Sequence, residues 1–384
     1  MNFQKFSRQE VVDFLKQHIH TDLPEFLLKR SPFTDISIQE LAQQLKGRKI
    51  AEKKFSFLLN DNIVFPPHLN LEQSSSESTS RYKAENLNGK TFLDLTAGFG
   101  IDAYFLSQNF QEITLLEKNE DLLNTVEHNW KILDKKAEFI LGDLEEFIAK
   151  TEKKFDVIYL DPARRSLEKR KVFLLEDLSP NILEIQDRSL ELGRVVITKL
   201  SPMIDITYLV SVLKDIFKIE IIAVKNDVKE VVVYQNKDLK ENNIEIICVD
   251  LETEEETFKY NFGEEKGAIA KFSNFQKYLY IPNNPILKSG AFNLISDKFK
   301  VFKLHQNTQF YTKENLIKEF PGRILEMKII NSKEIQKGEK WNIISKNYPL
   351  SVAEIEKKYK IKSGGNRYLI FTQTVSGKII LESL

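Results

Sequence analysis

The 384-residue chain has one cysteine and no apolar run approaching the roughly 18 residues that a membrane-spanning helix needs. A single cysteine excludes an internal disulfide, and Cys248 lies within the apolar stretch 244–251, where we expect a buried strand residue. The N-terminal stretch lacks an apolar signal core, so secretion is not expected. These features favour a protein of the reducing cytoplasm that does not enter a membrane.

Histidine is also scarce, and the five residues do not form a metal-binding pattern. His18 and His20 are two positions apart, which is not the spacing of a zinc-ligand set. The other three are scattered: His68, His128 and His305. We therefore predict no metal site.

The formal net charge is zero, but charge is unevenly distributed along the chain. Residues 272–384 carry 19 Lys and Arg against 9 Asp and Glu, so the rest of the chain has the opposite, acidic excess. A basic region favours a polyanion such as RNA as partner, because contacts of Lys and Arg with phosphates supply much of the sequence-independent affinity. The alternative is that lysine-rich faces only keep these domains soluble.

The stretch 91–100, TFLDLTAGFG, predicts a buried strand that runs into a tight turn. Gly98 and Gly100 then open a helical pattern over 101–108. A strand, a glycine turn and a helix start place unpaired backbone N–H groups at the carboxyl end of a sheet, where nucleotide-like ligands bind. We therefore expect a ligand-binding site here.

Two ligand classes fit this turn. Gly98, Gly100 and Ala103 satisfy the dinucleotide pattern G-x-G-x-x-A, and Glu117 ends the next strand, where a ribose-binding carboxylate belongs in either case. Asp94, however, would repel a pyrophosphate and attract the ammonium group of an amino acid. S-adenosyl-L-methionine combines an amino acid, a ribose and an adenine, so the sequence favours it over a dinucleotide.

Strands and helices alternate through the central part of the chain. This alternation predicts parallel strands with helices on both faces of the sheet. Strands are expected at 91–96, 112–116, 137–141, 155–160 and 194–199, and helices at 102–109, 119–133, 143–150 and 205–217. Only a short turn separates the expected strands 219–225 and 230–235, so these must pair antiparallel. A dinucleotide-binding sheet lacks such a closing hairpin.

Local sequence patterns predict the structure of the segments on either side of the central part. Ser7 with Glu10, and Ser37 with Glu40, fit capping boxes of short N-terminal helices. The composition of the serine-rich part of 71–90 predicts a flexible linker. Near the C-terminus we expect strands at 278–281 and 301–304, a helix at 313–319, and then a strand, a helix and a strand at 323–330, 351–359 and 368–374.

Five motifs recur in a recognisable order. They are DLTAGFGID (94–102), LLEKN (115–119), GD (142–143), DPARR (161–165) and the tail NYPLSVAEIEKKYKIKSGGNRYLIF (347–371). With them the chain resembles the class I S-adenosylmethionine-dependent methyltransferases, and most closely the bacterial group with a THUMP-like C-terminal domain. The resemblance implies an α/β fold, a Rossmann-like seven-stranded methyltransferase sheet, with an N-terminal helical domain and small C-terminal α+β domains.

The resemblance also implies domain boundaries. The N-terminal helical domain would cover 1–70, and the methyltransferase domain 71–265, with 71–90 as a connecting segment. A small α+β domain, for which a ferredoxin-like fold is one option, would cover 272–320, and the THUMP-like domain 321–384. The polar segment before the first strand would fold over the cofactor side, so that Ser80, Tyr82 and Lys83 would line the site, with Tyr82 and Lys83 as substrate-binding residues.

Cofactor-binding residues follow from the same resemblance. Asp94 would pair with the ammonium of S-adenosylmethionine, and Gly98 and Gly100 would let the backbone approach it. Glu117 would accept bonds from the ribose hydroxyls, the alternative being an exposed turn residue. Asp143 would accept from the adenine amino group, a role compatible with capping the next helix.

Two further residues of the loop each allow two assignments. Thr96 replaces the commoner glycine of the family, so the loop is either slightly wider or its hydroxyl donates to the cofactor carboxylate. Asp102 is either a charge that complements the helix dipole or a second contact to the methionine amine. Both are retained as cofactor-binding candidates.

Asp161, Pro162, Ala163 and Arg164 resemble the [DN]-PP-[FYW] motif of enzymes that methylate planar nitrogen. There the carboxylate or amide accepts from exocyclic N–H groups and aims the nitrogen lone pair at the methyl carbon. We predict Asp161, Pro162 and Arg164 as catalytic residues. Ala163 and Arg164 depart from the motif, but a guanidinium can stack on a base or clamp a phosphate.

The basic residues after this motif complete the candidate substrate site. Arg165, Lys169 and Arg170 would contact the substrate, the alternative being a solvated charged helix. The predicted function is methylation of a base nitrogen of structured RNA, either tRNA or rRNA, in the cytoplasm. The alternatives are a methyltransferase acting on a small molecule or protein, and a non-catalytic RNA-binding protein on a methyltransferase scaffold.

Overall fold

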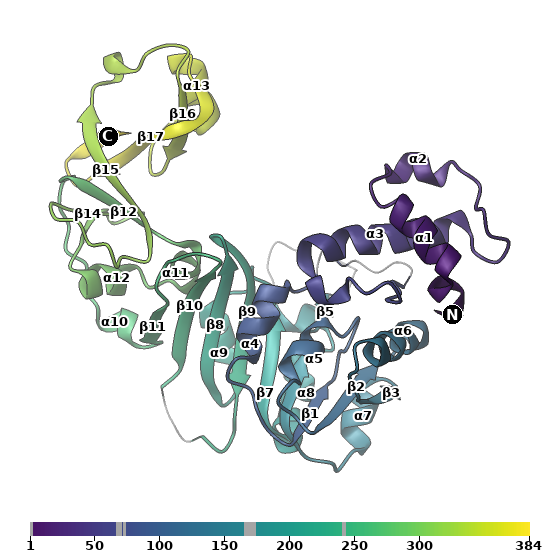
Figure 1. The fold of residues 1–384 in the computed structure, drawn as a ribbon. Helices are drawn as coiled ribbons and strands as arrows, with labels where there is room; N and C mark the ends of the chain where they lie inside the picture. Colours follow the sequence, from purple (N-terminus) through teal and green to yellow (C-terminus); the bar gives the residue numbers. More distant parts are fainter. Residues whose placement is uncertain (1–2, 67–70, 72–73, 165–173, 240–242) are drawn as a thin grey trace. The chain divides into compact units, whose positions relative to one another are not determined.

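The structure is a computed structural model that describes residues 3–66, 71, 74–164, 174–239 and 243–384. The chain divides into two compact units (Figure 1). Unit 1 comprises Met1–Phe217 and Lys229–Glu241, and unit 2 comprises Lys218–Val228 and Asn242–Leu384. The two strands of one hairpin belong to different units. Each unit is therefore built from two separate stretches of sequence.

Unit 1 opens with a helical part and continues with alternating strands and helices. Its helices are α1 (Gln9–Gln17), α2 (Leu23–Leu27), α3 (Ile38–Lys54), α4 (Glu77–Ala84), α5 (Ile101–Leu106), α6 (Glu120–Ile132), α7 (Leu144–Lys150), α8 (Ile182–Leu192) and α9 (Ile206–Val212), with 3₁₀ turns at Phe3–Ser7, Ser56–Leu58 and Leu175–Asp177. Its strands are β1 (Thr91–Asp94), β2 (Glu112–Glu117), β3 (Glu138–Leu141), β4 (Phe155–Leu160), β5 (Ala163–Arg164), β6 (Leu178–Ser179), β7 (Gly193–Leu200) and β9 (Asp227–Gln235).

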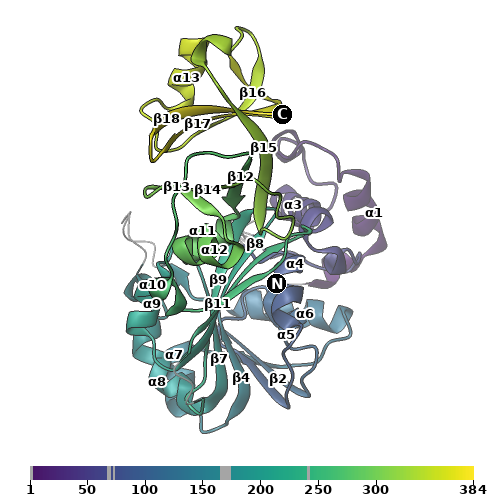
Figure 2. The same ribbon diagram turned by 90° about the vertical axis from the view of Figure 1, so that its left-hand side faces the viewer.

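The sheet of unit 1 has the order β9-β7-β4-β1-β2-β3. All neighbours are parallel except β9, which runs antiparallel to β7. Helices α4, α5 and α6 lie on one side of this sheet and α7, α8 and α9 on the other (Figure 2). β8 (Ile216–Val224) joins β9 through a two-residue turn, Lys225 and Asn226, whose φ angles of 51° and 64° suit a hairpin. The predicted α/β methyltransferase fold is confirmed, although the described residues form a sheet of nine strands rather than the expected seven.

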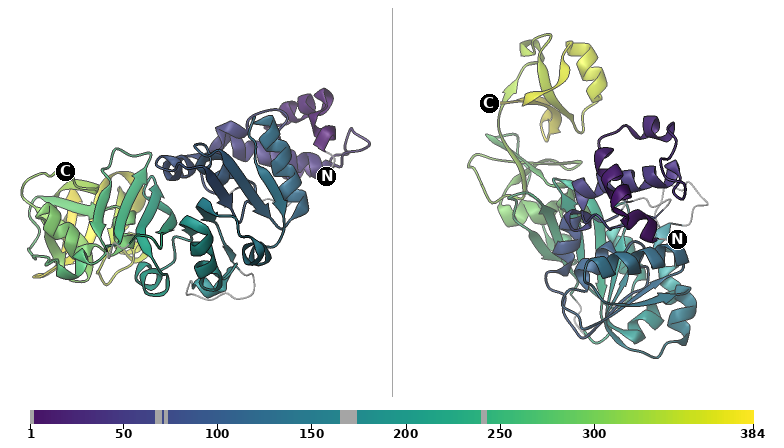
Figure 3. Two further views of the ribbon diagram at one scale, coloured as in Figure 1. Left: turned by 90° about the horizontal axis from the view of Figure 1, so that it is seen from below. Right: turned by 45° about the vertical axis from the view of Figure 1, so that its right-hand side comes forward.

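The N-terminal helical part packs onto the first helices of the α/β part (Figure 3). Ala51, Phe55 and Phe65 share a buried cluster with Ile101 of α5. The Asn129 side chain of α6 donates to the Val64 carbonyl and accepts from its N–H at 2.8 and 2.9 Å. These contacts anchor the helical part beside the loop that follows β1.

Two local expectations for unit 1 are wrong. Ser37 and Glu40 form the predicted capping box of α3, but Ser7 and Glu10 do not, since α1 is capped at Arg8 without a side-chain bond. Ser7 is instead the last residue of the 3₁₀ turn Phe3–Ser7, one position before the residue that caps α1. The expected linker contains a helix, α4, whose start is capped by the Ser76 hydroxyl, which accepts from the Thr79 N–H.

Unit 2 consists mainly of strands. They are β8, β10 (Glu245–Leu251), β11 (Phe258–Asn261), β12 (Tyr278–Pro282), β13 (Phe302–His305), β14 (Thr308–Lys313), β15 (Gly322–Ile330), β16 (Lys340–Ser345), β17 (Lys362–Thr374) and β18 (Gly377–Ser383). Its helices are α10 (Glu264–Gly267), α11 (Asn284–Ser289), α12 (Phe292–Phe299) and α13 (Val352–Tyr359), with a 3₁₀ turn at Ser332–Glu334.

β15 connects the two small C-terminal domains. Its first half pairs with β12 and its second half with β18, in the strand order β13-β14-β12-β15-β18-β17-β16. The expected helix at 313–319 is wrong, because Lys313 still pairs with Tyr278 as the last residue of β14 and turns follow it. Cys248 is buried in β10, as predicted. In the described ranges, no helix is long and apolar enough to cross a membrane.

Candidate functional site

The loop between β1 and α5 adopts the tight turn that its glycines predict. Gly98 and Gly100 have φ angles of 54° and 72°, which L side chains rarely adopt. A Cβ on Gly100 would also lie 2.9 Å from Trp130 Nε1 and 3.0 Å from Val126 Cγ1, both on α6. A Cβ on Gly98 would meet only the Thr96 carbonyl, at 3.8 Å. Gly100 therefore lets α5 pack against α6, whereas Gly98 mainly supplies the turn.

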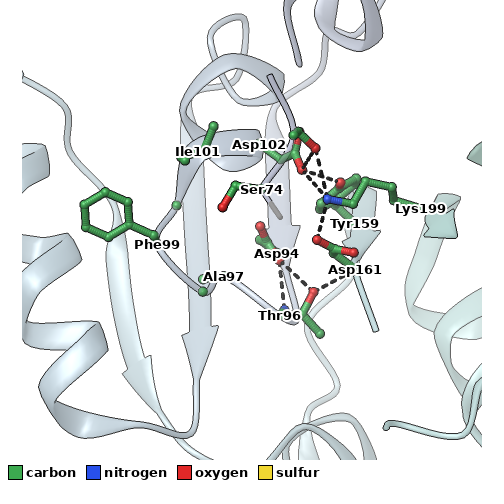
Figure 4. Close-up of a pocket in the computed structure, with 13 residues that line it drawn as sticks. Ser74, Asp94, Thr96, Ala97, Phe99, Ile101, Asp102, Tyr159, Asp161 and Lys199 are labelled. Atoms are coloured by element: carbon green, nitrogen blue, oxygen red, sulfur yellow. Dashed lines mark hydrogen bonds and ion pairs between the residues drawn. The ribbon is translucent and has the colours of Figure 1, made fainter. Parts of the chain in front are cut away.

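A cavity of about 170 Å³ lies at this loop (Figure 4). Its walls come from the loop itself, the segment before α4, and the carboxyl ends of β1, β4 and β7. The lining residues are Ser74, Ser75, Asp94, Thr96, Ala97, Gly98, Phe99, Gly100, Ile101, Asp102, Tyr159, Asp161 and Lys199. Five of the predicted cofactor residues and Asp161 thus meet in one cavity.

Asp94 ends β1 and is 2% exposed. Its Oδ1 accepts from the Thr96 N–H at 2.8 Å and from the Thr96 hydroxyl at 3.4 Å, while its Oδ2 receives no hydrogen bond from any described residue. Burial raises the pKa of Asp94 to about 8, partly offset by the Thr96 N–H. A buried carboxylate oxygen at a cavity, without a donor, is suited to a cationic ligand group.

Glu117 ends β2 and is held by the backbone. Its Oε2 accepts from the Gly98 N–H at 3.0 Å and its Oε1 from the Asn119 N–H at 2.9 Å. Each oxygen keeps a second lone pair, so the carboxylate can still accept from ligand hydroxyls. Asp143 is exposed and caps α7, accepting from the Glu146 N–H at 3.2 Å, as its alternative assignment predicts.

Lys83 does not lie where a substrate contact would. Its side chain is 0% exposed, and its Nζ lies 2.9 Å from Asp102 Oδ1 and 2.7 Å from Glu230 Oε1. A fully buried ammonium with two carboxylate partners cannot contact RNA, so the predicted substrate-binding role of Lys83 is wrong. Tyr82 is half-buried on α4 and does not line the cavity.

Asp102 lies at the centre of a buried network of charged side chains and hydroxyl groups and is not free to bind a ligand. Besides Lys83, its oxygens accept from the Ser75, Ser80 and Tyr159 hydroxyls at 2.7 to 2.8 Å. Burial would raise the pKa of Asp102, but Lys199 and Lys83 hold it well below its usual value. The carboxylate borders the cavity and is at the same time fully satisfied by protein groups.

Lys199, near the end of β7, is the functional candidate that sequence reasoning missed. Its Nζ bridges Asp102 Oδ2 at 3.1 Å and Asp161 Oδ2 at 2.5 Å, and donates to the Ser75 hydroxyl at 2.9 Å. Burial would lower the pKa of Lys199, but Asp102, Asp161 and Glu230 raise it above its usual value. A lysine within the apolar stretch 195–200 was the available signal.

Asp161 follows β4 and faces the cavity beside Lys199 (Figure 4). Its N–H donates to the Thr96 hydroxyl at 2.7 Å, which fixes the backbone at the start of the DPARR motif. Its side chain is 41% exposed, and its Oδ1 receives no hydrogen bond from the described part of the chain. Ala163 and Arg164 form β5, which pairs with β6, while Arg165, Lys169 and Arg170 lie outside the described residues.

Comparisons with known proteins agree with this geometry. Family models match at residues 77–179 (conserved hypothetical protein 95), 278–321 (ferredoxin-like domain) and 323–382 (THUMP domain-like). The crystal structure of a protein assigned as a methyltransferase in Porphyromonas gingivalis W83 covers 97% of this chain and 96% of its own, with a TM-score of 0.85 and 26% identity.

The curated relatives described next match less than half of the chain. An uncharacterized RNA methyltransferase of Protochlamydia amoebophila is 27% identical over 166 residues, covering 41% of this chain and 38% of that protein. Ribosomal RNA small subunit methyltransferase J of Coxiella burnetii is 26% identical over 160 residues, covering 32% of this chain and 62% of that protein. The chain therefore spans less than two thirds of the length of either relative.

The fold, the loop after β1 and the likeness to the Porphyromonas gingivalis protein are those of a class I methyltransferase. Ferredoxin-like and THUMP-like domains follow it in the same chain, so the resemblance that the sequence motifs indicate is confirmed. Across the described residues, no group of three or more His, Cys, Asp or Glu side chains could hold a metal ion.

Proposed function

We propose that this chain transfers a methyl group from S-adenosyl-L-methionine to a base nitrogen of structured RNA, tRNA or rRNA, in the cytoplasm. The observation that carries the proposal is Asp94, a buried carboxylate that lines the same cavity as Asp161 and whose Oδ2 has no donor among the described residues. Names of the relatives from Protochlamydia and Coxiella, the THUMP-like domain and the basic stretch 272–384 favour RNA as the substrate.

The residues present fit the cofactor. Asp94 Oδ2 would accept from the methionine ammonium, and the Glu117 carboxylate, already held by Gly98, would accept from the ribose hydroxyls. Gly98 and Gly100, with φ angles of 54° and 72°, form the tight turn whose backbone the ligand would approach. When bound, S-adenosylmethionine supplies a methyl carbon attached to a positively charged sulfur, which is electrophilic without any metal ion.

Asp161 would orient the acceptor nitrogen. Lys199 binds Asp161 Oδ2, so the carboxylate cannot rotate freely and its Oδ1 remains as an acceptor for a substrate group. An exocyclic amino group that donates to Oδ1 has its N–H bonds fixed, and its lone pair then points toward the methyl donor. Because the transfer is an in-line displacement, such positioning supplies much of the rate acceleration.

The pKa of Asp94 gives a direct test of the cofactor assignment. In the free protein a pKa of about 8 leaves Asp94 mostly protonated at pH 6 to 7, whereas an ammonium ligand requires the carboxylate. Binding of S-adenosylhomocysteine should therefore release a proton, and its affinity should rise by up to about tenfold per pH unit between pH 6 and 8. Isothermal titration calorimetry in two buffers of different ionisation heat measures both effects.

The matched variant is Asp94→Asn, which keeps the side-chain shape and cannot titrate. We expect it to bind S-adenosylhomocysteine more weakly and without the pH dependence below pH 8. NAD is the control ligand and should not bind the wild type. An affinity of the wild type that does not change between pH 6 and 8, or an equal pH dependence in the variant, would contradict the assignment of Asp94.

A further inference from the structure

Unit 2 contains a larger cavity that the proposed methyl transfer does not use. Its volume is about 550 Å³, a size suited to a nucleotide-sized ligand. The turn after β8, the end of β10, the β13–β14 turn, the start of β15 and the end of β16 form its walls. Ile281, Pro282 and Ile344 supply apolar surface between these polar segments.

Three residues that line this cavity each carry a buried oxygen without a hydrogen-bond partner in the described structure. They are Asp250 Oδ2, Thr308 Oγ1 and Gln309 Oε1. The other oxygen of Asp250 accepts from the Asn226 N–H at 2.8 Å, so the carboxylate is fixed in place. Since unpaired buried polar groups are costly, and two of these three atoms can only accept, they indicate a ligand that brings donors.

Cationic side chains stand at the same cavity. Arg323 and Lys346 line it, are exposed, and form no ion pair with any described residue. The Arg323 guanidinium lies 4.9 Å from the centre of the Tyr368 ring, which limits its range of orientations. A third lining cation, Lys225, is already paired with Glu252 at 2.9 Å. Glu255 also lines the cavity, and its Oε2 accepts from the Asn283 side chain at 2.7 Å. Two cations without an ion pair, beside buried acceptors, suit a ligand with an anionic group and N–H donors.

We propose that this cavity binds a nucleotide whose base carries an exocyclic amino group, with the base toward Asp250 and Gln309 and the phosphate toward Arg323 and Lys346. The nucleotide could come from an unpaired position of an RNA or from a free mononucleotide. Only the RNA source rests on the proposed function, because the cavity lies wholly within unit 2. Adenine, cytosine and guanine have the required amino group, whereas uracil does not.

The test uses the full-length chain and isothermal titration with AMP, CMP, GMP and UMP, each up to about 5 mM, a range that detects millimolar affinity. We expect at least one amino-bearing nucleotide to bind at least about tenfold more tightly than UMP. Arg323→Gln and Asp250→Asn should each weaken that binding by about tenfold. Lys337→Gln, an exposed cation of the same domain outside the cavity, is the matched control and should leave it unchanged.

A short unpaired oligonucleotide separates the two sources. If the oligonucleotide binds more tightly than every mononucleotide and Arg323→Gln weakens its binding, the site binds an unpaired position of RNA. If only a mononucleotide binds in this way, the free mononucleotide is the ligand. The proposal is overturned if no mononucleotide or oligonucleotide binds, if UMP binds as well as the others, or if Arg323→Gln behaves like the control. These variants should bind S-adenosylhomocysteine as tightly as the wild type. That control distinguishes failure of this proposal from failure of the proposed function.

Discussion

Replacing Asp161 by Ala is expected to lower kcat for methyl transfer by about a hundredfold or more, because the acceptor nitrogen loses the group that aligns it. Asp161 lines the cavity and its Oδ1 has no donor among the described residues, while Lys199 at 2.5 Å holds the other oxygen. The affinity for S-adenosylhomocysteine should stay within about threefold of the wild type, since Asp94 and Glu117 are unchanged. The measurement is transfer of labelled methyl to RNA from a strain that lacks this gene.

Asp161→Asn is the matched control for this prediction. It keeps an acceptor oxygen at the same place and lacks only the charge that pairs with Lys199. We expect a loss of about tenfold, smaller than that of the alanine variant. An alanine variant that methylates RNA at the wild-type rate would show that Asp161 does not orient the substrate.

Lys83→Met is expected to cause the largest loss of stability among these variants. The substitution keeps the length of the apolar stem but leaves Asp102 and Glu230 buried with one cation fewer. Removing one partner of a buried ion pair costs about 3–5 kcal/mol in the free energy of unfolding. The melting temperature should therefore fall by about 10 °C, which calorimetry or circular dichroism measures.

Lys90→Met provides the comparison within the same segment. Lys90 is 68% exposed and pairs with Glu112 at 3.4 Å, and such surface pairs contribute at most about 1 kcal/mol. Its melting temperature should stay within about 2 °C of the wild type. Equal losses for the two variants would contradict the account of Lys83 as part of a buried network.

The sequence was sufficient to predict the parts of the site that are local. The strand, the glycine turn and the helix start lie within residues 91–108, and Asp94 and Glu117 end strands that are adjacent in sequence and in the sheet. The alternation of strands and helices and the hairpin after it also follow from local patterns. These elements carry the class I fold, and the structure confirms it.

The buried network could not be predicted in this way. Lys83, Asp102, Lys199 and Glu230 come from four separate elements, and their pairing depends on tertiary packing that no local pattern encodes. Serine-rich composition before β1 suggested a linker, yet Ser75 and Ser80 are hydrogen-bonded to Asp102. The helix predicted at 313–319 is wrong for a similar reason, because pairing of Lys313 with β12 overrides local helix propensity.

We propose that this chain methylates a base nitrogen of RNA with Asp161 as the orienting group. The most direct measurement is mass spectrometry of the nucleosides of tRNA and rRNA from cells without the gene, and from the same cells carrying the wild type or Asp161→Ala. The account predicts that one N-methylated nucleoside disappears with the gene, returns with the wild type and does not return with the variant. Nucleoside profiles that are identical in all three strains would contradict it.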